Sequence, residues 1–136
     1  MEMKTKWLIG IIAVVLFGAG LWFAGVLPFG GTAVAPSLDR PITAPADFSP
    51  EARAILEQNV LQLKESIRVN PEVSDSWLDL AIYYKTANDL DGAIEIWKYL
   101  GEGKQNAIAL HNLGNTYHLY LKKYSEAEKY YREAVE

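Results

Sequence analysis

Two histidines are the first residues whose type suggests chemistry. His111 and His118 are the only ones in this chain of 136 residues, and they lie seven positions apart. On a helix, this spacing places both on one face but about 10 Å apart along the axis, too far to share a metal ion. No carboxylate stands within one turn of either histidine. We therefore expect them to have structural or groove-lining roles rather than to bind a metal.

The other candidate motifs also favour simple structural roles. Residues 88–92 read Asn-Asp-Leu-Asp-Gly, but the acids lack the twelve-residue register of a calcium loop, so they predict a tight turn. Lys122 and Lys123 form a basic pair typical of a solvated loop. There is no cysteine, glycine-rich phosphate loop or nucleophile–base pair, so we predict no enzyme, cofactor or metal site. A net charge of −4 argues against a nucleic-acid partner.

Residues 7–27 form an uncharged and mostly apolar stretch of 21 residues. As a helix it spans about 30 Å, the thickness of a bilayer core. Lys4 and Lys6 precede it, so the positive-inside rule predicts that residues 1–6 are cytoplasmic and that the rest of the chain is extracytoplasmic. The alternative is a cleaved signal peptide, with a cleavage site after Ala35. The length of the apolar stretch and the following Pro36 favour a single-pass anchor.

Residues 28–49 are predicted to form a flexible linker. Five of the six prolines in the chain fall between Pro28 and Pro50, with small and polar residues among them. Proline restricts the backbone to extended conformations, so this stretch is expected to act as a tether reaching up to roughly 60 Å from the membrane.

Residues 50–136 show the pattern of a helical domain. Ser49 is a plausible N-cap with Pro50 at the first helical position, and Asn70-Pro71 ends the first helix. The chain then repeats itself, with four matching pairs 33 positions apart and two pairs 34 apart. These pairs are Trp77 with Leu110, Leu80 with Leu113, Ala81 with Gly114, Tyr84 with Tyr117, Ala93 with Ala127, and Trp97 with Tyr131. Each copy is predicted to be a helical hairpin, with one extra residue in the second turn near Lys122.

The repeated pattern W-x2-L-[G/A]-x2-Y, followed by A-x3-aromatic, resembles the tetratricopeptide repeat. Residues 77–84 and 110–117 both carry it, and Pro71 lies where that family places a proline between repeats. The resemblance implies an all-α solenoid of two full repeats, at about 74–105 and 107–136, preceded by a helix of a degenerate repeat.

In that family, the first helix of each hairpin lines a concave inner face that binds peptides. The resemblance places nine residues there: Leu78, Ile82, Lys85, Thr86, His111, Asn112, Asn115, His118 and Leu119. Asn112 and Asn115 offer both donors and acceptors to an extended peptide backbone. Only Lys85 is basic, so a grip on a C-terminal carboxylate is not expected.

The sequence thus predicts a non-enzymatic, membrane-anchored scaffold that binds a protein or peptide. Its architecture is similar to that of bacterial-type envelope assembly factors, which suggests a periplasmic or extracellular helical domain. The alternative is a structural module that forms homo-oligomers. In this reading, the last helix, which no capping helix follows, and the membrane span with its Gly20-x-x-x-Ala24 spacing drive association.

Overall fold

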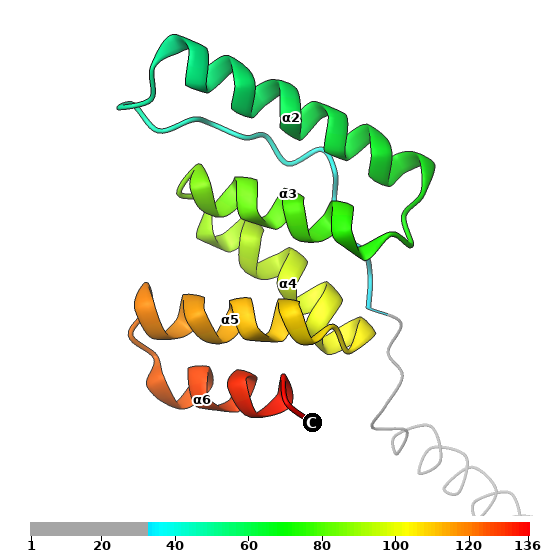
Figure 1. Ribbon diagram of the computed structural model, residues 1–136, viewed down its shortest axis with the longest axis vertical. Coiled ribbons are helices and arrows are strands. Elements are labelled where there is room, and N and C mark those ends of the chain that lie inside the picture. The colour runs from blue at the N-terminus through cyan, green and yellow to red at the C-terminus, as the bar shows by residue number, and fades with distance from the viewer. Residues whose placement is uncertain (1–32) are drawn as a thin grey trace, which may run out of the picture. The chain divides into compact units, whose positions relative to one another are not determined.

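The computed structural model describes residues 33–136, and this part of the chain contains five α-helices and no β-strand (Figure 1). The helices are α2 (Pro50–Val69), α3 (Ser74–Thr86), α4 (Leu90–Lys104), α5 (Ala107–Leu119) and α6 (Tyr124–Glu133). They stack in chain order, and each packs mainly against its neighbours in the sequence. This all-helical arrangement of hairpins is consistent with the predicted solenoid.

The predicted membrane span at residues 7–27 lies outside the described residues. Within residues 33–136, none of the helices combines the length and the apolar character needed to cross a bilayer.

Side chains next to the helix ends explain where the helices begin and turn. Ser49 Oγ accepts a hydrogen bond from the Ala52 amide at 3.1 Å, as expected for an N-cap. Asp89 and Asn106 cap α4 and α5 in the same way. The α3–α4 turn has three residues and the α5–α6 turn has four, so the predicted extra residue is confirmed. Residues 122 and 123 are exposed in that turn, as predicted for a loop.

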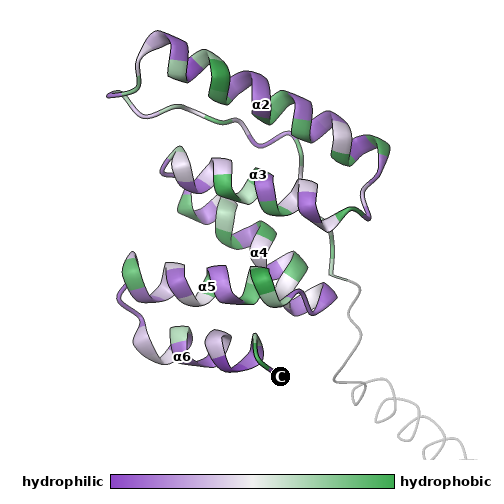
Figure 2. Ribbon diagram, in the orientation of Figure 1, coloured by the Kyte–Doolittle hydropathy of each residue, from purple (hydrophilic) through white to green (hydrophobic). Residues whose placement is uncertain are grey.

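Close packing within each hairpin depends on a small residue on its first helix. Gly114 of α5 faces the ring of Tyr131 of α6, and a Cβ at this glycine would lie 2.5 Å from the ring atoms Cδ1 and Cε1. In the preceding hairpin, Ala81 and Trp97 hold the matching positions and both are fully buried. Figure 2 shows apolar residues alternating with polar ones along the helices, as expected when only one side of each helix is buried.

Residues 38–44, which we call the strap, begin with a turn at residues 38–39, have no regular secondary structure after it and pack against the helices. Leu38 and Ile42 contact the hydrophobic core, and Ala44 is buried. The Arg40 guanidinium donates to both carboxylate oxygens of Asp89, at 2.6 and 2.7 Å, and lowers the pKa of that carboxyl.

The strap therefore differs from the flexible tether predicted for residues 28–49. The Arg40 carbonyl oxygen accepts hydrogen bonds from Lys64 Nζ of α2 and from the Tyr84 hydroxyl of α3. Pro41 restricts the backbone of the strap, as expected. Every second residue of the strap is turned toward the helices: residues 38, 40 and 42 are partly buried and Ala44 is buried, whereas residues 39, 41 and 43 are exposed.

Candidate functional site

The nine residues assigned to the inner face come from α3 and α5. On α5, His111, Asn115 and His118 share one side of the helix because they are spaced by four and three residues. All three gather around Tyr131 of α6. The Tyr131 hydroxyl donates to Asn115 Oδ1 at 2.9 Å, and its ring centroid lies 5.6 Å from that of His111 and 6.5 Å from that of His118.

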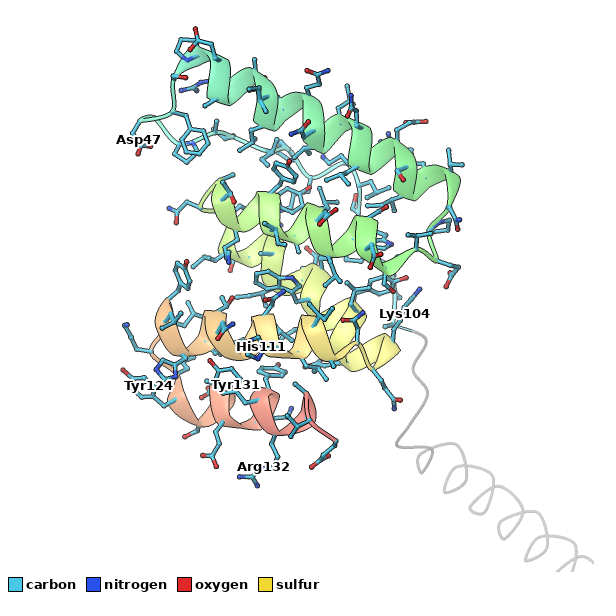
Figure 3. All side chains as sticks on the ribbon, viewed as in Figure 1. Asp47, Lys104, His111, Tyr124, Tyr131 and Arg132 are labelled. Atoms are coloured by element: carbon cyan, nitrogen blue, oxygen red, sulfur yellow. The ribbon has the colours of Figure 1, made fainter. Side chains whose placement is uncertain are left out.

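The residues of α6 in this group extend the predicted site. His118 also packs edge-on against Tyr124, with ring centroids 5.3 Å apart. In Figure 3, the labelled His111, Tyr124 and Tyr131 lie at the junction of α5 and α6. From the sequence, Tyr131 was identified only as the repeat match of Trp97, and Tyr124 was given no role. The repeat match to Trp97 could have indicated the position of Tyr131, because Trp97 also contacts a residue of the inner face, Lys85.

That match is visible on α3. Lys85 Nζ lies 5.9 Å from the centroid of the Trp97 ring, just as His118, its counterpart 33 residues later, lies beside Tyr131. A cation above an aromatic ring is favoured electrostatically. The two hairpins therefore build the same arrangement from different side chains: an ammonium over an indole in one, and an imidazole beside a phenol in the other.

The inner-face residues differ in how much surface they present. Ile82 is 43 % exposed to solvent and Leu119 is 56 % exposed, whereas Leu78 is only 7 % exposed. Leu78 therefore belongs mainly to the core, and its contribution to a binding surface is small. Thr86 is exposed, and its hydroxyl donates to the Ile82 carbonyl oxygen.

Free amide groups give this face its hydrogen-bonding capacity. Among the described residues, the Asn112 side chain makes no hydrogen bond, so its donors and its acceptor are both available. Asn115 uses its oxygen for Tyr131 and keeps its NH₂ group available. An extended peptide backbone presents the complementary carbonyl and N–H groups.

The structure offers a defined role for the acidic turn at residues 88–92. Asn88 adopts the left-handed conformation with φ of 63°. Asp89 Oδ1 accepts from the Gly92 amide at 3.0 Å while the same carboxylate binds Arg40. The predicted tight turn is confirmed. Within residues 33–136, no three side chains of histidine, aspartate or glutamate come together as a metal site.

Comparison with known proteins supports the repeat assignment in the C-terminal half. The family model for the tetratricopeptide repeat matches residues 88–136, which span α4, α5 and α6. No curated protein and no solved structure matches the chain. A tetratricopeptide repeat is therefore present at residues 88–136, and such repeats are typical of protein-interaction scaffolds.

Proposed function

We propose that this protein is a non-enzymatic scaffold that binds a protein or peptide on its inner face. The observation that carries the proposal is the combination on one face of exposed apolar side chains, Ile82 and Leu119, with the available amide groups of Asn112 and Asn115. Apolar contacts supply affinity, while amides supply hydrogen bonds to a peptide backbone. A tetratricopeptide repeat at residues 88–136 supports this reading.

We further propose that residues 7–27 anchor the scaffold in a membrane, with residues 1–6 in the cytoplasm and the helical domain on the opposite side. The support is the uncharged stretch and the two lysines that precede it. In this placement, the helical domain serves the assembly of an envelope complex.

A capture experiment with matched variants tests binding on the inner face. The full-length wild-type chain and its Asn112→Ala variant are used as bait, and the captured proteins are compared quantitatively. Asn112→Ala is expected to reduce capture of a specific partner by about tenfold, since a desolvated amide that loses its hydrogen bonds costs about 1–2 kcal/mol.

A control variant separates binding from structural damage. Lys98→Ala changes α4, outside the inner face, and should leave capture unchanged. Equal capture by wild type and Asn112→Ala contradicts the proposal. A homo-oligomer as the only captured species favours the self-associating alternative.

A further inference from the structure

One side of α2 is open to solvent next to its buried stripe. Counting back 33 residues from the buried Ala93, Trp97 and Leu100 of α4 gives Val60, Lys64 and Ile67, which are also buried. On the neighbouring side of α2, Asn59 and Leu63 are half-buried and Ser66 is exposed.

The residues before α2 do not cover this side. The strap reaches α2 at Lys64, whose side chain donates to the Arg40 carbonyl oxygen. Lys64 lies five residues after Asn59, which places it about 140° around the helix. The strap and the open side therefore lie on different flanks of the contact between α2 and α3.

The open side forms a groove with α3. Its cavity has a volume of about 370 Å³, and we call it the α2–α3 groove; it is lined by Asn59, Gln62, Leu63, Ser66, Asp79 and Tyr83. Five of these six side chains are polar. An apolar helix would leave these polar groups without partners, at a cost of about 1–3 kcal/mol for each.

The polar groups of the groove have unused hydrogen-bond donors and acceptors. Asn59 Nδ2 donates to the Tyr83 hydroxyl at 2.8 Å, which leaves the Asn59 oxygen as an acceptor and the Tyr83 hydroxyl hydrogen as a donor. The Gln62 amide has no hydrogen bond within residues 33–136. The Asp79 carboxylate is exposed and forms no ion pair among the described residues. The groove thus offers paired backbone-like donors and acceptors beside one negative charge.

We propose that the α2–α3 groove binds a lysine- or arginine-bearing segment of the protein partner. The segment's main chain bonds to Asn59 and Gln62, its aliphatic stem lies on Leu63, and its cation reaches Asp79. Charge complementarity selects this occupant, because the only charged group lining the groove is a carboxylate. The inference rests on the proposed function, which it extends from the inner face to a second contact of stated charge.

Peptide titration followed by NMR tests the inference on the full-length chain in nonionic detergent. The probes are acetyl-Gly-Ala-Lys-Ala-Gly-amide and the same peptide with glutamate in place of lysine. The lysine peptide is expected to shift the side-chain amide signals of Asn59 and Gln62 with saturation, and to bind about threefold to fivefold more tightly than the glutamate peptide. Asp79→Asn should abolish this preference.

Glu57→Gln is the matched control for the loss of one negative charge. Glu57 is exposed and lies two residues before Asn59, about 200° around α2 from it, so the preference for lysine should remain. Equal binding of both peptides, or a preference that survives Asp79→Asn, overturns the inference. No shift at Asn59 and Gln62, as expected if another segment or a second copy fills the groove, also overturns it.

The two proposals fail separately in these experiments. The proposed function is tested by capture through Asn112, on a different helix from the groove. If Asn112→Ala loses capture but the groove shows no preference for the lysine peptide, binding at the inner face is supported and only the second contact is rejected.

Discussion

Gly114 shows how one side chain fixes the spacing of a hairpin. Its lack of a Cβ lets the Tyr131 ring lie against the α5 backbone, where the Tyr131 hydroxyl reaches Asn115. We expect Gly114→Ala to lower the free energy of unfolding by about 1–3 kcal/mol, because the ring must move to relieve the overlap. Urea denaturation measures this change.

A second substitution on α5 controls for that measurement. Ile108 is 60 % exposed, so Ile108→Ala should change the free energy of unfolding by less than about 0.5 kcal/mol. If Gly114→Ala proves as mild as Ile108→Ala, the close contact described here is not part of the native packing.

Titration of the buried Tyr84 hydroxyl should make the stability of the fold depend on pH above pH 10. Burial raises its pKa from 10.0 to about 12. Below pH 10, the hydroxyl keeps its proton in both the folded and the unfolded state, so its full contribution to the free energy of unfolding is present. Between pH 10 and 12 the unfolded state releases the proton first, so stability should fall with rising pH, by about 2 kcal/mol from this group.

Comparison with Tyr84→Phe isolates that contribution. Lys64 faces the same carbonyl oxygen, and burial lowers its pKa, so its titration acts in the opposite direction and is common to both proteins. We expect the wild type to lose more stability than Tyr84→Phe between pH 10 and 12, as measured by denaturation at each pH. Parallel pH profiles would contradict a buried, neutral Tyr84.

The strap shows how an element without regular secondary structure can hold helices together. Arg40 connects it to the α3–α4 turn through two short hydrogen bonds to Asp89, and both side chains are about one-third exposed or less. Arg40→Ala should lower the free energy of unfolding by about 1–2 kcal/mol, and Arg40→Lys should have a smaller effect because one of the two bonds can remain.

Arg132→Ala is the appropriate control, since Arg132 forms an ion pair of the same 2.6 Å length with Glu128 but both side chains are largely exposed. Its effect should not exceed about 0.5 kcal/mol. Thermal unfolding can rank the three variants. Equal effects of Arg40→Ala and Arg132→Ala would mean that the strap is not bound to the helices in solution.

The helices were predictable from sequence and the strap was not. Caps such as Ser49 and the repeat of aromatic and small residues mark the helices locally. By contrast, Arg40 and Asp89 lie 49 positions apart, and their pairing depends on the folded arrangement of α2, α3 and α4. The alternation of residues 38–44 is a weak signal, because Pro41 in this segment, with Pro36 and Pro45 beside it, also favours a free linker.

The arrangement of all the helices explains which residues of the candidate site could be predicted from the sequence. The 33-residue match puts Lys85 and His118 at equivalent positions, and the structure shows both beside aromatic rings of second helices. Leu78 could not be separated from Ile82 by pattern alone, since burial on a helix that touches two neighbours depends on the packing of both. The α2–α3 groove depends on where the strap passes, so no local motif marks it.

The most direct test of the scaffold account is hydrogen–deuterium exchange of the full-length chain with and without a partner isolated by capture. If the inner face binds the partner, protection should increase in peptides covering residues 78–86 and 111–119. Segments away from that face, such as the outer side of α4 and the strap, should change little. Protection confined to the strap or to α4, with α3 and α5 unchanged, would contradict the assignment of the inner face as the binding surface.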